Sequence, residues 1–304
     1  MRTSSVADVV TKAHLGAVFT RHEALAAGVT PAQLRGPGVH TVFRGVFTIA
    51  DPAGLSTRAR AALALAGPQA LVCGTTALAL LGVALPDARP TQTVHVWVPP
   101  SRGLITVPGI CGHRDTLSLR PKQVMSGIVA VNPAECWLQA AQATSVADLV
   151  VLADGLTRRR DPLLELDDLR EVLEGAAGRR GVRAARAALA LAREGTDSPM
   201  ETVLRLALVG SGLPCPIVNH PLRGPRGGVL YFLDMAYPDA LVGVEYDGAG
   251  HVGNPAQMRR DQARRRWIED RGWRLITATA IDLADPSGIV GSVRRALDGR
   301  RPAA

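Results

Sequence analysis

Residues 229–248, VLYFLDMAYPDALVGVEYDG, consist of two apolar runs separated by a proline-containing turn. Both runs are short and bounded by turn residues, so we expect two neighbouring antiparallel strands. Glu245 and Asp247 are two positions apart, and their side chains therefore project from the same face of the strand. Asp234 ends the preceding strand and can lie beside Glu245 across the hairpin. The stretch thus predicts a group of carboxylates at the strand ends.

Such a group of carboxylates needs compensating positive charge. Acidic side chains at neighbouring strand ends repel one another unless a cation neutralises them, which favours a divalent metal ion. Oxygen ligands suit Mg²⁺ or Mn²⁺ better than zinc. His251 follows Asp247 after a flexible Gly-Ala-Gly and is a candidate metal ligand, general base or leaving-group acid. The alternatives are solvated strand-end carboxylates and, for His251, a hydrogen bond within the loop.

The elements around this hairpin complete a predicted order of helix, three strands, helix and strand. The first helix has Ser198 as its cap and Glu201 at its third position. The predicted elements outside the hairpin are a helix at 197–213, a strand at 215–222, a helix at 254–272 and a strand at 273–283.

This order and its residues resemble the PD-(D/E)xK restriction-endonuclease fold, and in particular its very-short-patch-repair-like endonuclease branch. The branch's pattern D…vExDG..H…D..R…G is matched within residues 197–285 by Asp234, Glu245, Asp247, Gly248, His251, Asp261, Arg264 and Gly272. The resemblance implies an endodeoxyribonuclease in which Asp234 and Glu245 hold Mg²⁺ or Mn²⁺, with Asp247 and His251 assisting. Glu201 resembles the helix glutamate that often precedes this core, although a capping box accounts for the same residue.

One signature position departs from the family pattern. The family has a lysine two residues after the glutamate, and this chain has Asp247 there. Two interpretations stay open. Either the base has shifted to a residue such as His251, or the domain is a catalytically inactive descendant that still binds DNA.

The helix predicted after the hairpin concentrates positive charge beside the proposed site. It carries clustered arginines, of which Arg264 and Arg265 share a face with Asp261. We expect Arg260, Arg264 and Arg265 to contact phosphates, as a DNA-binding helix requires. A solvated helix face is the alternative.

Residues 18–50 predict a second compact unit of helix, turn, helix and hairpin. FTRHEALAAG has Thr20 as a helix cap and Glu23 as its capping-box partner, and VTPAQLRG predicts a second short helix at 29–36. VHTVFRGVFTIA predicts a hairpin that turns near Arg44. The combination suggests a winged helix-turn-helix, with a small structural cap as the alternative.

This N-terminal segment resembles the winged-helix domain of AbiEi-type antitoxins of type IV toxin–antitoxin systems. TTALALLGVALP and HVWVPPSRG, further along, resemble the region that follows in such proteins. The resemblance implies operator DNA binding, with Arg35 and Arg44 as candidate contacts, and a cognate toxin or antitoxin as partner. The sequence Gly36-Pro37-Gly38 directly after the second helix departs from a full recognition helix.

The chain between these two parts contains fewer candidate functional residues. His95, His113, Asp115 and Glu135 are its candidate polar residues, but their spacing matches no metal or catalytic pattern, so we expect structural roles for them. The sequence therefore predicts an α+β multi-domain protein with four parts. These are a winged-helix domain (1–52), a mixed α+β domain (53–155), a helical connector (156–195) and a restriction-endonuclease-like α-β-β-β-α-β domain (196–304).

The composition fits an anionic partner. The 304 residues carry a formal net charge of +8, which favours DNA, and only 4% are aromatic, which argues against ring stacking as the main binding mode. The four cysteines form no CxxC pair, and the N-terminus lacks a signal-peptide core. We expect a cytoplasmic protein without a membrane span.

Together these features predict a metal-dependent DNA endonuclease-like protein linked to a toxin–antitoxin or phage-defence system. The alternative is a DNA-binding regulator or antitoxin whose nuclease-fold domain is degenerate. A protein-interaction module, with arginines that reflect composition alone, is a third hypothesis.

Overall fold

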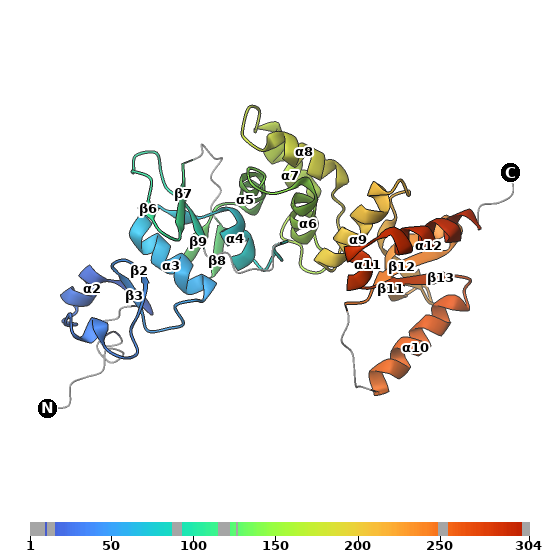
Figure 1. The fold of residues 1–304 in the computed structure, drawn as a ribbon, viewed down its shortest axis with the longest axis horizontal. Coiled ribbons are helices and arrows are strands. Elements are labelled where there is room, and N and C mark those ends of the chain that lie inside the picture. Colours follow the sequence, from blue (N-terminus) through green and yellow to red (C-terminus); the bar gives the residue numbers. More distant parts are fainter. Residues whose placement is uncertain are drawn as a thin grey trace. The chain divides into compact units, whose positions relative to one another are not determined.

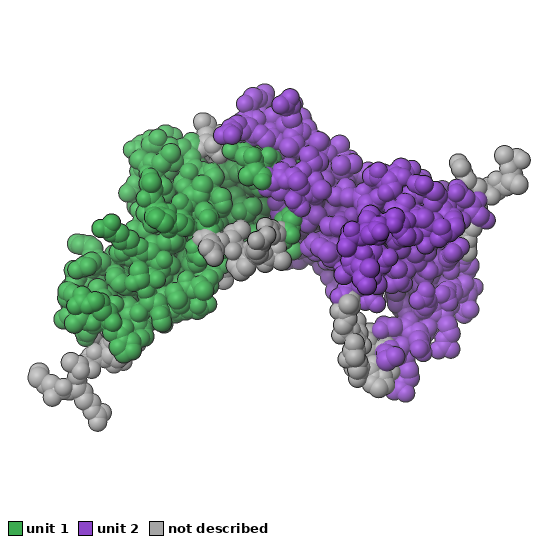
Figure 2. All heavy atoms as spheres, in the orientation of Figure 1, with its two compact units in different colours: residues 1–143 green, residues 144–304 purple. Residues whose placement is uncertain are grey.

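The structure is a computed structural model. It describes residue 10 and residues 16–86, 93–114, 122–125, 127–248 and 255–299. These residues form a mixed α+β protein with three β-sheets (Figure 1). The chain divides into two compact units, residues 1–143 and residues 144–304, which are coloured separately in Figure 2.

Unit 1 begins with a small three-stranded sheet. Its elements are β1 (Val18–Thr20), α2 (Arg21–Ala26), the 3-10 helix η1 (Gln33–Arg35), β2 (His40–Phe43) and β3 (Val46–Thr48). α2 begins at Thr20, whose side chain and that of Glu23 form the predicted capping box. The hairpin of β2 and β3 turns at the predicted place, where Gly45 adopts φ +84°.

The second predicted helix is shorter than the sequence indicated. A helix was expected over residues 29–36, but only the single turn η1 forms. Gln33 and Thr30 hydrogen-bond each other as in a cap, with the Gln33 N–H donating to Thr30 Oγ1 at 3.2 Å. Gly36, Pro37 and Gly38 follow at once, and neither glycine nor proline favours continuation of a helix. The segment therefore ends after one turn.

The rest of unit 1 is built around a six-stranded sheet of order β6-β7-β5-β4-β9-β8. In chain order its elements are α3 (Leu55–Ala66), β4 (Leu71–Val72), α4 (Gly74–Leu80), β5 (Val94–Trp97), β6 (Thr106–Val107), β7 (Ile110–His113), β8 (Lys122–Met125), β9 (Ile128–Ala130) and α5 (Pro133–Ala140). Phe43 and Val46 of the N-terminal hairpin share a buried core with Ala62 of α3 and Val96 of β5. The predicted boundary at residue 52 thus falls within one shared core.

Unit 2 begins with helices that pack on one another. They are α6 (Val146–Leu156), α7 (Leu166–Glu174), α8 (Val182–Leu191) and α9 (Pro199–Gly210). α6 therefore lies in unit 2, whereas the sequence placed most of it in the middle domain. α9 begins at Ser198, with Pro199 at its first position, as the sequence predicted.

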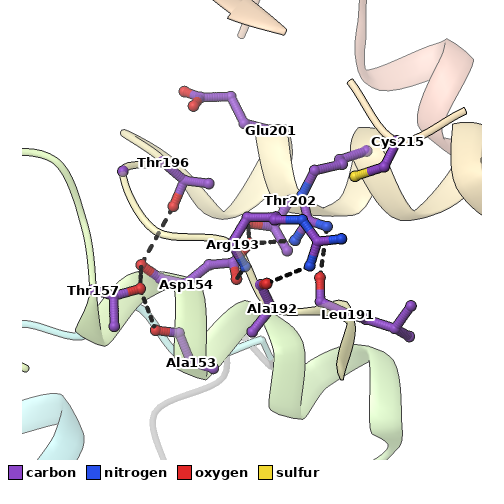
Figure 3. A network of polar contacts seen from close by, with 12 residues as sticks. Ala153, Asp154, Thr157, Leu191, Ala192, Arg193, Thr196, Glu201, Thr202 and Cys215 are labelled. Carbon is purple, nitrogen blue, oxygen red and sulfur yellow. Dashed lines mark hydrogen bonds and ion pairs between the residues drawn. The ribbon is translucent and has the colours of Figure 1, made fainter. Parts of the chain in front are cut away.

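A buried ion pair joins α6 to α9. Arg205 Nη2 lies 2.5 Å from Asp154 Oδ2, and the two side chains are 1% and 0% exposed. Thr202 Oγ1 and the Arg193 N–H also donate to the Asp154 carboxylate, both at 2.8 Å (Figure 3). Glu201 lies on the same helix but points away from this network in Figure 3. Asp154 and Arg205 therefore serve the packing of helices.

The C-terminal sheet has the order β10-β11-β12-β13. Its elements are β10 (Ile217–Arg223), β11 (Val229–Tyr237), the 3-10 helix η2 (Pro238–Ala240), β12 (Val242–Tyr246), α10 (Pro255–Glu269), β13 (Arg274–Ala278), α11 (Ala280–Ala284) and α12 (Ser287–Asp298). From α9 to β13 the main elements follow the predicted order of helix, three strands, helix and strand. β12 and β13 are parallel, and α10 supplies the crossover that a parallel pair requires.

Helices cover both faces of this sheet (Figure 1). On one face Leu204 of α9 and Val293 of α12 pack on Val244 of β12. On the other face Ile268 of α10 packs with Leu233 of β11. Asp234 lies within β11 and not at its end as predicted, because this strand continues to Tyr237, whereas Glu245 lies near the end of β12. Among the described residues, no helix is both long enough and apolar enough to cross a membrane.

Candidate functional site

Asp234 and Glu245 come together through the pairing of β11 with β12. These strands are antiparallel, and Met235 pairs with Val244. The next positions outward are Asp234 and Glu245. The Asp234 side chain reaches across to β12, where the N–H of Tyr246 donates to its Oδ2 at 2.9 Å. The pairing of β11 with β12 therefore places the two carboxylates opposite each other on neighbouring strands.

Arg264 is the cation that faces Glu245. From α10 it donates to both carboxylate oxygens of Glu245, with Nη1 lying 3.0 Å from Oε2 and Nη2 bonded to Oε1. Its Nη2 also donates to the Phe232 carbonyl at 2.8 Å. The pair is half-buried, and such a bidentate geometry is the strong form of this interaction. Arg264, predicted as a phosphate contact, is thus engaged with a predicted metal ligand.

Asp234 has the most unusual electrostatics of this group. Burial, then the charges of Glu201 and Glu245, raise its pKa from 3.8 to about 7, while the Tyr246 N–H and Arg264 act in the opposite direction. Strong perturbation by burial and by specific charged neighbours is common at functional sites. The pKa of Asp234 is thus raised mainly because its carboxyl is buried, and the two acidic neighbours add to this effect.

Glu201 caps α9, which is one of the two roles that the sequence left open. Its Oε2 accepts a hydrogen bond from the Asp197 N–H at 2.9 Å, and its own N–H donates to Ser198 Oγ at 3.3 Å, so it caps α9. Burial raises its pKa, and its charge also acts on Asp234. The capping carboxylate is therefore also a member of the acidic group.

The donor set fits a divalent cation by charge and by ligand type. Glu201, Asp234 and Glu245 supply three carboxylates, against which Arg264 supplies one positive charge. Hard oxygen ligands suit Mg²⁺ and Mn²⁺. In the described part of the chain, however, no three acidic side chains bring an oxygen each within 4.8 Å of one another. Arg264 lies against Glu245, and Glu201 is turned to its cap, which accounts for the open arrangement.

The other predicted site residues are more peripheral. Asp247 is exposed after β12, where its N–H donates to the Ala278 carbonyl at 2.8 Å. The predicted base His251 lies outside the described residues. Arg265 is paired with Glu269 at 3.0 Å on the exposed side of α10, and Arg260 is also exposed. These two arginines thus line the solvent side of the helix.

Two predicted DNA contacts lie in unit 1. Arg35 is exposed at the end of η1, and Arg44 is exposed at the tip of the hairpin between β2 and β3. Both side chains are accessible to a phosphate backbone.

Sequence reasoning missed a second group of chemically capable residues. His95, Cys111 and His113 each offer a ligand atom, and these atoms all lie within 4.8 Å of one another. We expected structural roles for both histidines because their spacing matched no known metal pattern. The available signal was Cys-Gly-His at 111–113, since alternate residues of a strand share a face.

Comparison with known proteins places the chain among mycobacterial relatives. It is 30% identical over 272 residues to "Uncharacterized protein Rv2248" of Mycobacterium tuberculosis strain H37Rv, which covers 89% of this chain and 97% of the relative. The same values hold for "Uncharacterized protein MT2308" of strain CDC 1551. The chain belongs to this Rv2248 family. The match is longer than either unit alone, so it includes residues of both.

The comparisons with family models and with solved structures assign the chain to no further family. No family model matches the chain. A solved structure, "Crystal structure of RV2827C protein from Mycobacterium tuberculosis", covers 74% of this chain and 90% of its own, with 16% identity and a TM-score of 0.40. A likeness at that level does not establish a shared fold.

Proposed function

We propose that residues 199–278 of this Rv2248-family protein form a nuclease-type domain that hydrolyses phosphodiester bonds in DNA with Mg²⁺ or Mn²⁺. The observation that carries the proposal is the position of Asp234. Asp234 lies opposite Glu245 in the pairing of β11 with β12, and burial together with the charges of Glu201 and Glu245 raises its pKa to about 7. Such a group of carboxylates favours a bound cation, because Arg264 provides only part of the compensating positive charge.

Asp234 and Glu245 are the residues that would hold the ion. When bound, a divalent ion of this class supplies a Lewis acid for a phosphoryl oxygen and lowers the pKa of a coordinated water. Glu201 adds a third negative charge from the start of α9. Arg264 holds Glu245 in place from α10 by donating to both of its carboxylate oxygens. His251 stays a proposed base or acid on the segment that follows β12.

Binding of the DNA backbone is assigned to exposed arginines. Arg260 and Arg265 lie on the solvent side of α10, the helix that also carries Arg264. In unit 1 the N-terminal hairpin resembles a wing with Arg44 at its tip, and Arg35 lies nearby in the chain on η1. Because η1 is a single turn, we assign the larger share of contact to the wing. Phosphate contacts of this kind supply affinity without sequence preference.

The biological setting is part of the same proposal. The resemblance of the N-terminal part to AbiEi-type antitoxins supports a role in a toxin–antitoxin or phage-defence system. A cognate toxin or antitoxin would then be the protein partner.

A second candidate function rests on the ion pair between Arg264 and Glu245. A guanidinium that occupies both oxygens of a predicted ligand is what a domain without a metal would use to neutralise it. Asp247, at the position of the family lysine, favours the same interpretation. The protein would then be a DNA-binding regulator or antitoxin that uses the nuclease-type fold as a scaffold.

A plasmid-nicking assay with Mg²⁺ or Mn²⁺ separates the two candidates. We expect the wild type to nick supercoiled DNA, and Asp234→Asn and Glu245→Gln each to lower the rate at least about 100-fold, as for other groups that stabilise transition-state charge. Asp239→Asn, an exposed acid in η2, is the matched control and keeps the rate. Equal cleavage by all variants would remove the assignment. Salt-sensitive DNA binding without any cleavage would favour the regulator.

A further inference from the structure

The six-stranded sheet of unit 1 gathers two histidines and a cysteine on one face. β5 and β7 are parallel neighbours, and their register pairs His95 with Cys111 and Trp97 with His113. Val94, Val96 and Val98 belong to the core that contains α3. Because alternate residues of a strand point to opposite faces, His95 projects from the other face. Paired residues of parallel strands share a face, so Cys111 and, two positions on, His113 project beside it.

The three side chains converge closely. His95 Nδ1 lies 2.8 Å from His113 Nε2. The two ring centroids are 5.1 Å apart and the ring planes are inclined by 30°, so the rings meet edge to edge through these nitrogens. Cys111 Sγ lies within 4.8 Å of a nitrogen of each ring. Two nitrogens in this position share a single proton, and a metal ion is the other species that two imidazole lone pairs can share.

We propose that His95, Cys111 and His113 form a binding site for a zinc-type divalent transition-metal ion. Two imidazole nitrogens and one thiolate are a ligand set that zinc favours, whereas Mg²⁺ and Ca²⁺ require oxygens. Three protein ligands leave the fourth tetrahedral position to water or to another ligand. The site is thus chemically distinct from the acidic group of unit 2, and it does not depend on the function proposed there.

The two imidazole nitrogens require only a small adjustment to admit the ion. With zinc–nitrogen bonds of about 2.0–2.1 Å at a tetrahedral angle, the two nitrogens lie roughly 3.3 Å apart. The observed separation is 2.8 Å, so the rings would have to open by about half an ångström. His113 is only half-buried.

The surroundings hold His95 in place. Its backbone N–H donates to Thr76 Oγ1 at 2.9 Å, and its carbonyl accepts the Cys73 N–H at 3.0 Å. The start of α4 lies against the side chain, since a Cβ placed on Gly74 would be 3.7 Å from that of His95. The position of this ligand is therefore fixed by β5 and α4.

Cobalt substitution of the full chain tests the site. The protein is stripped with chelator and titrated with Co²⁺ under a reductant that contains no thiol. We expect one equivalent to produce visible absorption of tetrahedral Co²⁺ and a thiolate-to-cobalt charge-transfer band, and Zn²⁺ to displace both signals. Cys111→Ser should abolish the charge-transfer band. Cys215→Ser, at an exposed cysteine of unit 2, is the matched control and should keep it.

Additional variants keep the test decisive if Cys111→Ser alters the fold. We expect His113→Gln and His95→Gln each to weaken Co²⁺ binding at least tenfold, with folding checked by circular dichroism. His220→Gln, a histidine of unit 2, should leave binding unchanged. The proposal is overturned if the wild type gives no thiolate-to-cobalt band, if Cys111→Ser keeps that band, or if Cu²⁺ binds while Zn²⁺ does not.

Discussion

The guanidinium of Arg264 on α10 donates hydrogen bonds to both carboxylate oxygens of Glu245 on β12. The sequence predicted that the strand-end carboxylates need a cation, and here a side chain of the protein supplies part of that charge. Asp234, the neighbour that Arg264 affects less directly, retains a pKa of about 7. The ion pair therefore neutralises one carboxylate of the group and leaves the group as a whole negative.

Removal of Arg264 should separate its structural role from its effect on a metal. In Arg264→Gln the carboxylate of Glu245 loses its ion pair with the guanidinium. A divalent cation that binds there is then no longer repelled by the positive charge of Arg264. We expect Mn²⁺ to bind roughly tenfold more tightly, a gain of about 1.4 kcal/mol, as measured by calorimetry. Without metal, the free energy of unfolding should fall by about 1–3 kcal/mol, because the lost pair is half-buried.

Arg265→Gln is the matched control on the same helix. Its pair with Glu269 is exposed, so we expect a change in stability below about 1 kcal/mol. Mn²⁺ binding should not change. Unchanged or lost Mn²⁺ binding in Arg264→Gln would contradict the competition between guanidinium and ion.

Asp234 should make the stability of unit 2 depend on pH. Its pKa rises from 3.8 in the unfolded chain to about 7 in the folded one, so the folded state binds more protons between these values. Stability should therefore be greatest below pH 4, fall as the pH rises towards 7, and change little above it. Asp234→Asn keeps the acceptor for the Tyr246 N–H but cannot ionise.

We expect Asp234→Asn to be more stable than the wild type at pH 8, by on the order of 1–3 kcal/mol, and nearly equal to it at pH 4. Denaturant unfolding at several pH values measures the difference. Asp239→Asn is the exposed control and should follow the wild type. A destabilised Asp234→Asn at pH 8 would show that the ionised carboxylate contributes favourable contacts that the account omits.

The buried pair of Asp154 and Arg205 should be much more sensitive to single substitutions than to a paired one. Arg205→Met leaves the Asp154 carboxylate buried without its cation, and we expect a loss of about 3–5 kcal/mol. In Asp154→Asn/Arg205→Met no charge is left unpaired, and the amide oxygen can still accept the Arg193 N–H. Chemical denaturation should show that the double variant recovers much of the loss. Additive losses would indicate that the two residues act independently.

The wing hypothesis makes a prediction about salt. If Arg44 contacts a phosphate, Arg44→Gln should weaken DNA binding for all sequences and reduce the slope of log K against log salt by about 1. Fluorescence anisotropy at several salt concentrations measures this slope. Arg170→Gln, at an arginine that is paired with Asp167 on α7, is the control and should keep the wild-type slope. Equal slopes for all three proteins would remove Arg44 from the DNA interface.

Local signals account for the parts of the fold that the sequence predicted well. Thr20 with Glu23 and Ser198 with Glu201 mark helix starts, and both helices begin there. Such signals act within a few residues, so they can be read without knowledge of the fold. The same holds for the turn of the N-terminal hairpin.

Contacts between distant segments could not be read in this way. Asp154 and Arg205 are 51 positions apart in the sequence, and their ion pair joins two helices. Arg264 contacts Glu245 only because α10 crosses back over the sheet. The group around His95 depends on the register of β5 with β7, which are not joined by a simple hairpin. Asp234 and Glu245 lie opposite each other, as the sequence predicted, but the prediction did not include the ion pair between Arg264 and Glu245.

Diffraction from crystals grown with Mn²⁺ tests the central claim most directly. The account predicts an anomalous peak next to the carboxylates of Asp234 and Glu245, with Arg264 displaced from at least one oxygen of Glu245. An Arg264 that stays bound to both oxygens, with no anomalous signal beside Asp234, would contradict it.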